Sequence, residues 1–149
     1  MITINKIFRF EAAHAIHGYL GKCANIHGHS YELHVGVRAS HPSEGMIDQL
    51  GIILDFKDLK KYVQESAINK VDHKLILSKE YPREMFANHH EYELLILNHE
   101  PTAENLIIYL RDRIRPCLPD SVRLNSLKLW ETKDSFAEWS VDRVVDLIK

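Results

Sequence analysis

The sequence predicts an α+β fold, in which an antiparallel four-stranded sheet carries two helices on one face. Three observations support this class. Two stretches near the start alternate between apolar and polar residues, two helical patterns occupy the middle, and two short strand-like stretches follow them. The resulting order, β-β-α-α-β-β, is typical of an antiparallel sheet with its helices gathered on one side.

The first two strands are expected over residues 1–14 and 27–38. In each stretch alternate positions are mostly apolar, as in a strand with one buried face. His14, His27 and His29 fall on the apolar side, because residues two apart share a face of a strand. Each of the two strands therefore ends in inward-pointing histidine.

The two helices are expected over residues 54–70 and 101–114, where apolar residues recur at helical spacing. Asp55 is the expected N-terminal cap of the first helix, and Thr102 that of the second. Glu104 lies in the first turn of the second helix, where a carboxylate suits the positive end of the helix dipole.

The last two strands are expected over residues 123–132 and 135–141. The segment 78–100 has no clear period. Its "EYELLILN" stretch is compatible with a short extra strand or a short helix, and His89 and His90 are expected to be exposed.

Composition limits the classes of function. The chain has 149 residues, which is enough for one domain with a real core, and 45% of them are apolar. A net charge of -2 gives no general attraction to nucleic acid or membranes. No window approaches the roughly 18 apolar residues of a membrane helix. The charged, alternating start does not resemble a signal peptide, so a cytoplasmic protein is expected.

The only cysteines are Cys23 and Cys117. Cys117 follows an apolar helical pattern and is expected to be a small buried side chain. Two cysteines could form a disulfide, but nothing in the sequence indicates an oxidising compartment.

His14, His27 and His29 suggest a metal site. Imidazole suits zinc, and three neutral nitrogens with an open fourth position form the catalytic type of zinc site. The alternative is a closed structural site with Cys23, in the loop 15–26, as the fourth ligand. That alternative is weaker, because a zinc knuckle would need a second cysteine pair and a chain of this size does not need a metal to fold.

Two acidic positions are further candidates. Asp72 and His73 are adjacent and follow the first helix; by themselves they are most simply a polar turn. Glu131 shares strand parity with Leu129, which would place a carboxylate on a buried face. A buried acid needs donors, and a ligand with two adjacent N–H groups would supply them. The opposite parity would turn Trp130 inward, and periodicity alone does not decide.

Five motifs occur in order along nearly the whole chain: "FEAAH" ending at His14, Cys23-x₃-His27-Gly-His29, Asp72-His73, "PTAEN" at 101–105 and "ET" at 131–132. Together they closely resemble the 6-pyruvoyl-tetrahydropterin synthase and 6-carboxy-tetrahydropterin synthase family. The resemblance implies one domain over residues 1–149 with the tunnelling fold, in which antiparallel sheets from several subunits join into a barrel with helices outside.

The resemblance also assigns roles. It implies a zinc site on the three histidines, a catalytic thiol at Cys23, and an Asp72–His73 pair that reaches the cysteine from a neighbouring subunit of a homo-oligomer. It places the carboxylate that anchors the pterin ring at Glu131. Thr102 and Glu104 would lie near the pterin, although helix capping explains both equally well. The implied zinc ligands are His14, His27 and His29.

The three residues between Cys23 and His27 look like the 6-carboxy branch. The implied activity is a zinc-dependent lyase reaction that converts 7,8-dihydroneopterin triphosphate to 6-carboxy-5,6,7,8-tetrahydropterin with release of acetaldehyde and triphosphate, in queuosine biosynthesis. Two alternatives are a pyruvoyl-forming or side-chain-cleaving enzyme on the same fold, and a non-catalytic zinc-binding assembly module. The long segment 78–100 and the tail 140–149 depart from the family pattern.

Overall fold

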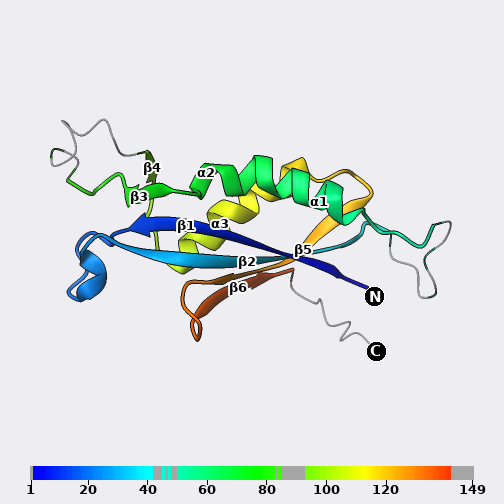
Figure 1. Cartoon of the computed structure of the whole chain (residues 1–149), viewed down its shortest axis with the longest axis horizontal. Helices are drawn as coiled ribbons and strands as arrows, with labels where there is room; N and C mark the ends of the chain where they lie inside the picture. The colour runs from blue at the N-terminus through cyan, green and yellow to red at the C-terminus, as the bar shows by residue number, and fades with distance from the viewer. Residues whose placement is uncertain are drawn as a thin grey trace, which may run out of the picture.

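A single mixed sheet covered on one face by helices forms the structure (Figure 1). The computed structural model describes residues 2–41, 45, 47, 50–82, 84 and 93–141. The elements in chain order are β1 (Ile4–His14), β2 (His27–Ala39), α1 (Phe56–Val63), a π-helical stretch (Gln64–Ile68), α2 (Asn69–Val71), β3 (Lys74–Ser78), β4 (Leu94–Leu97), α3 (Ala103–Ile114), β5 (Val122–Trp130) and β6 (Phe136–Ser140).

The α+β class and the helices on one face agree with the prediction, but the expected four-stranded antiparallel sheet is wrong. The described residues form a six-stranded sheet in the order β4-β3-β1-β2-β5-β6. The two additional strands are parallel to their neighbours, because β1 pairs with β3 and β3 with β4 in parallel. The remaining neighbouring strands pair in antiparallel fashion.

Periodicity could not find β3, because its apolar side chains are buried on both faces of the sheet. Ile76 belongs to the main core, whereas Leu75 and Leu77 belong to a second, smaller apolar cluster. A strand buried on both faces is a continuous apolar run without alternation. β4 decides the ambiguous stretch in favour of a strand. His89 and His90 lie outside the described residues, as does the tail after residue 141.

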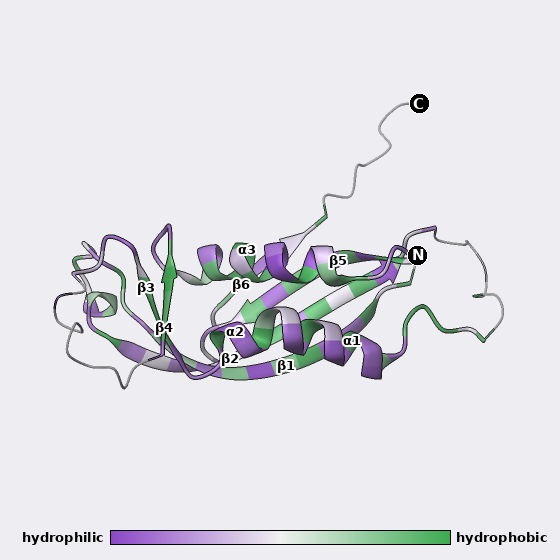
Figure 2. Cartoon of the chain, turned by 90° about the horizontal axis from the view of Figure 1, so that it is seen from above, coloured by the Kyte–Doolittle hydropathy of each residue, from purple (hydrophilic) through white to green (hydrophobic). Residues whose placement is uncertain are grey.

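The helices begin where the sequence predicts. The side chain of Asp55 accepts a hydrogen bond from the Lys57 N–H at 2.7 Å, and Thr102 accepts one from the Asn105 N–H at 3.3 Å. Figure 2 shows α1–α2 and α3 lying side by side over the strands. Their buried residues, which pack on the sheet, include Leu59, Val63, Ala67, Leu106, Leu110 and Ile114.

The register of β1 and β2 brings the predicted histidines to one end of the sheet. His14 pairs with His27, and Ala12 pairs with His29. This end also carries β3 and β4, and it lies far from the chain's N-terminus (Figure 1). The side chain of His14 points to the helix-covered side, in line with the buried residues Phe8, Phe10 and Ala12.

Both cysteines are free. The expected burial of Cys117 is wrong: it is exposed, because it lies in a short 3₁₀ turn (Arg115–Cys117) beyond the last buried residue of α3. Within the described part of the chain, none of the helices has the length and apolar character that a membrane span requires.

Candidate active site

His14, His27 and His29, the histidine cluster, meet at the junction of β1 and β2. Each offers one ring nitrogen, and these three atoms all lie within 4.8 Å of one another. His14 is buried, at 2% exposure, and the other two are half-buried. The strand register therefore produces the predicted convergence, with two residues from β2 and one from β1.

Backbone carbonyls orient two of the rings. Nδ1 of His14 lies 2.7 Å from the Pro101 carbonyl oxygen, and Nδ1 of His27 lies 2.8 Å from that of Asn25. A carbonyl only accepts, so each Nδ1 donates, and in a neutral ring Nε2 then keeps a bare lone pair. The two Nε2 atoms are 3.2 Å apart. A metal cation bound by both lone pairs would stabilise this close contact.

The cluster fits a metal ion. Nε2 of His29 is buried and has no hydrogen-bond partner among the described residues. Burial lowers the pKa of His14, which favours the neutral ring that a metal requires. Tetrahedral zinc ligands at 2.0–2.1 Å lie about 3.3–3.4 Å apart, close to the separation observed between the Nε2 atoms of His14 and His27. Carbonyls on the opposite ring nitrogens are the usual outer partners of metal-binding histidines.

Glu131 lies beside the histidine cluster, as the inward parity predicts. Its Oε1 is 3.6 Å from Nε2 of His14 and 4.0 Å from Nε2 of His29. The Tyr31 hydroxyl donates a hydrogen bond to the same oxygen at 3.2 Å. Tyr31 is fully buried and stacks on Phe10, with ring centroids 5.0 Å apart. Burial raises the pKa of Tyr31, and the nearby Glu131 carboxylate raises it further, so the hydroxyl stays protonated and remains a donor.

Cys23 lies in the loop between β1 and β2, residues 15–26, which we call the cysteine loop. It is the middle residue of a 3₁₀ turn (Lys22–Ala24) and is half-buried. The Cys23 carbonyl accepts a hydrogen bond from the Ile16 N–H at 2.9 Å. This bond ties the turn back to the end of β1, two residues beyond His14.

Asp72 and His73 form a close pair at the edge between α2 and β3. Nδ1 of His73 lies 2.9 Å from Oδ1 of Asp72, and the same oxygen accepts a hydrogen bond from the Glu11 N–H at 3.0 Å. His73 has a φ of 57°, an uncommon backbone conformation for a residue with a side chain. Its own N–H donates to the Glu11 carbonyl at 2.6 Å. The pair is thus held rigidly, while the His73 side chain is 77% exposed.

Within one chain the pair is not brought to the cysteine. His73 lines a hollow of about 600 Å³ together with Glu11, Ser30 and His29 of the histidine cluster, and Cys23 does not line it. Glu11 and Ser30 alternate with the helix-facing residues of their strands. They therefore lie on the outer face of the sheet, opposite to the helices.

Thr102 and Glu104, the two weaker predictions, begin α3. The Thr102 side chain is engaged as the helix cap, and Glu104 is exposed in the first turn. The preceding carbonyl, that of Pro101, contacts His14, so the start of α3 is adjacent to the histidine cluster. Their predicted contact with a pterin stays a prediction.

Sequence reasoning missed Tyr31 and Pro101. Strand parity could have indicated Tyr31, because it shares the apolar face with His29 two residues earlier. The contact between Pro101 and His14 spans 87 residues and uses a backbone carbonyl, so no sequence signal could have found it.

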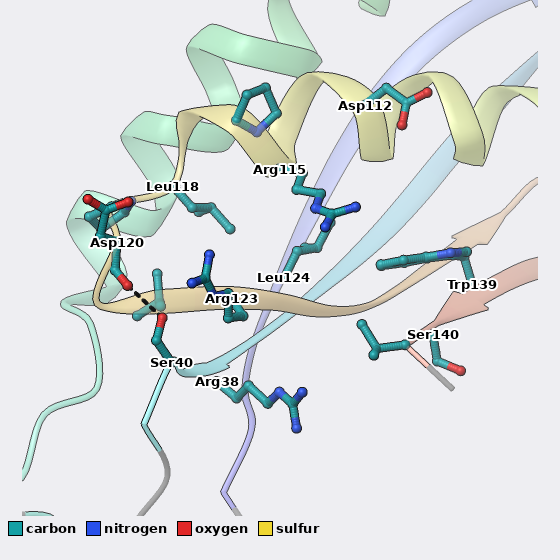
Figure 3. Close-up of a pocket in the computed structure, with 14 residues that line it drawn as sticks. Arg38, Ser40, Asp112, Arg115, Leu118, Asp120, Arg123, Leu124, Trp139 and Ser140 are labelled. Atoms are coloured by element: carbon teal, nitrogen blue, oxygen red, sulfur yellow. Dashed lines mark hydrogen bonds between the residues drawn. The ribbon is translucent and has the colours of Figure 1, made fainter. Parts of the chain in front are cut away.

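A different hollow, of about 930 Å³, lies between the end of α3 and the strands (Figure 3). Arg115 enters it from the turn after α3 and Trp139 from β6, while Arg38 and Arg123 occupy opposed positions on β2 and β5. None of the predicted site residues lines this hollow.

The model of the family described as 6-pyruvoyl tetrahydropterin synthase matches residues 3–141. The chain belongs to this family. A relative from Rickettsia typhi, named 6-carboxy-5,6,7,8-tetrahydropterin synthase, is 33% identical over 143 residues, which cover 93% of this chain and 99% of the relative.

Two further comparisons show what else the chain is similar to. A protein from Pyrococcus furiosus named dihydroneopterin monophosphate aldolase is 32% identical over 122 residues, which cover 82% of each chain. The structure of 6-pyruvoyl tetrahydropterin synthase from Caenorhabditis elegans superposes with a TM-score of 0.68 over 95% of this chain and 96% of that one, at 23% identity. The chain thus shares its fold with the Caenorhabditis elegans structure.

Proposed function

We propose that this protein is a zinc-dependent, pterin-processing lyase that converts 7,8-dihydroneopterin triphosphate and water to 6-carboxy-5,6,7,8-tetrahydropterin, acetaldehyde and triphosphate. One observation carries the proposal: three histidine nitrogens converge on one point, and the Glu131 carboxylate lies 3.6 Å from one of them. The name of the relative from Rickettsia typhi supports the choice of product.

The histidine cluster would hold the metal. His14, His27 and His29 offer three neutral nitrogens, and carbonyls already fix two of these rings. When bound, zinc would act as a Lewis acid that lowers the pKa of substrate hydroxyls.

Glu131 would bind the pterin ring. Its carboxylate can accept the two adjacent N–H groups at the edge of a pterin, an arrangement that gives both affinity and orientation. The Tyr31 hydroxyl holds one carboxylate oxygen at 3.2 Å, which restricts the rotation of this acceptor before substrate arrives. The reacting side chain of the pterin would then extend toward the histidine cluster.

Cys23 would be the general base that removes a proton from a side-chain carbon of the substrate. Nδ1 of His73 lies 2.9 Å from the Asp72 carboxylate, and Nε2 of that ring would exchange a proton with a second group. Because His73 lies on the outer face, it would serve the cysteine of a neighbouring copy. The active protein is therefore a homo-oligomer with active sites between subunits.

Side-chain cleavage without the carboxy product is the second candidate reaction, and the name of the relative from Pyrococcus furiosus favours it. Retro-aldol cleavage would use the same histidines and the same carboxylate but would release glycolaldehyde or its phosphate in place of acetaldehyde. Pyruvoyl formation would release triphosphate alone.

Product analysis tests the proposal. Purified protein loaded with zinc is incubated with 7,8-dihydroneopterin triphosphate, and acetaldehyde is trapped as its hydrazone while pterins are separated by chromatography. Equal amounts of acetaldehyde and carboxypterin are expected. Glycolaldehyde phosphates would assign the aldolase reaction, and an intact substrate would overturn the proposal. A cytoplasmic location and a place in queuosine biosynthesis stay predictions.

A further inference from the structure

Glu100, which precedes α3, contacts the cysteine loop. Its Oε2 accepts a hydrogen bond from the His17 N–H at 2.7 Å, across 83 residues of sequence. Glu100 is half-buried, and the His17 ring lies edge-on to Tyr81 with centroids 6.0 Å apart. His17 is therefore held by its backbone on one side and by its ring on the other.

The loop residue just before this contact holds the cysteine turn. The Ile16 N–H donates to the Cys23 carbonyl at 2.9 Å. Two consecutive amides of the loop thus have different partners: Ile16 binds Cys23, and His17 binds Glu100. Because these two rigid peptide units are joined at the Cα atom of Ile16, fixing His17 also restricts the turn that carries Cys23.

Glu100 is itself fixed to the metal site. The next residue, Pro101, supplies the carbonyl that binds Nδ1 of His14. The Glu100 carbonyl accepts the Thr102 N–H and the Asn105 side-chain amide, each at 2.9 Å. Hydrogen bonds therefore connect the start of α3 both to the histidine cluster and to the cysteine loop.

We propose that Glu100 is a positioning residue that sets the location of Cys23 relative to the histidine cluster. Its carboxylate binds the cysteine loop, while the adjacent Pro101 carbonyl binds His14. The two contacts together would fix the distance between the cysteine loop and the histidine cluster. Glu100 does not touch the reacting atoms in this account. The inference rests on the role of Cys23 in the proposed function.

Glu100→Ala and Glu100→Gln in the zinc-loaded protein test this inference. The amide oxygen of glutamine can still accept the His17 N–H, whereas alanine cannot. Glu80→Ala, the removal of an exposed carboxylate, is the matched control. We expect kcat of Glu100→Ala to fall by about tenfold to 10²-fold, since a misplaced reactive group can lower a rate by ~10²-fold. KM and zinc content should stay unchanged. Glu100→Gln recovers most of kcat.

Hydrogen exchange over residues 15–26 provides a readout that does not depend on activity. Exchange there should accelerate in Glu100→Ala and stay near wild type in Glu100→Gln and Glu80→Ala. Wild-type kcat in Glu100→Ala would overturn the inference, because the loop contact would then be structural only. Loss of zinc, or faster exchange over the whole chain, would also overturn it.

A wild-type protein that is inactive on the pterin would refute the proposed function and leave the position of Cys23 to be tested by itself. The rate of Cys23 alkylation by iodoacetamide is then compared in a Cys117→Ser background. The half-buried thiol should react severalfold faster in Glu100→Ala than in the Glu80→Ala control. Equal rates would overturn the inference.

Discussion

The histidine cluster and the Asp72–His73 pair are both held by main-chain hydrogen bonds, but only the cluster is complete within one chain. Three ring nitrogens converge there, and Tyr31 and Glu131 close the side toward the core. The Asp72–His73 pair is fixed just as firmly by Glu11, yet its imidazole is exposed on the outer face.

In the proposed function, this difference means that the site is divided between subunits. Two hydrogen bonds with Glu11 fix the backbone around His73, whose φ is 57°. This uncommon conformation would contribute nothing to function if the His73 ring faced only water. Among the described residues, the ring of His73 has no polar contact other than the one with Asp72. A fixed backbone at His73 would place its ring where Cys23 of another copy could contact it.

The largest loss of activity is expected when the histidine cluster is disrupted. His27→Ala removes one of three metal ligands, so zinc affinity should fall by more than the ~10–100-fold that outer partners of a metal site contribute. Activity should disappear with the metal. Zinc content after dialysis, measured by plasma emission spectroscopy, checks this. The control is His99→Ala, an exposed histidine; equal zinc in both variants would refute the metal site.

Cys23→Ala separates catalysis from metal binding. A general base contributes about 10²–10⁴-fold to a rate, so kcat should fall by that factor while zinc content stays unchanged. Cys117→Ala, at the exposed cysteine, should leave both unchanged. Loss of zinc together with stability in Cys23→Ala would instead support the closed structural site and a non-catalytic module. Retained activity would exclude Cys23 as the base.

The smallest effect is expected at Tyr31. Tyr31→Phe keeps the stacking on Phe10 but deletes the hydroxyl that donates to Glu131. A hydrogen bond to a charged group is worth about 1.5–3 kcal/mol, so the dissociation constant for a pterin should rise about tenfold or more. Fluorescence titration with neopterin measures this, with Tyr62→Phe on α1 as control. Unchanged affinity would show that Tyr31 does not prepare the carboxylate.

Alternation was sufficient to predict the histidine cluster, because strands with one buried face reveal their geometry in the sequence. It left the parity of Glu131 open, and the structure decides it in favour of the inward orientation. It could not predict β3, whose side chains are buried on both faces. It also could not predict contacts through backbone groups, such as the Pro101 carbonyl on His14. Cys117 was misplaced because the helical pattern continues past the last buried turn.

Mixed assemblies of Cys23→Ala and His73→Ala chains test the divided site most directly. Neither variant should be active by itself. If each site takes Cys23 from one chain and His73 from another, a random 1:1 co-assembly restores both groups in about one quarter of the sites. We therefore expect about a quarter of wild-type turnover after co-refolding. Turnover no higher than that of either variant alone would contradict the account, because both groups would then come from the same chain.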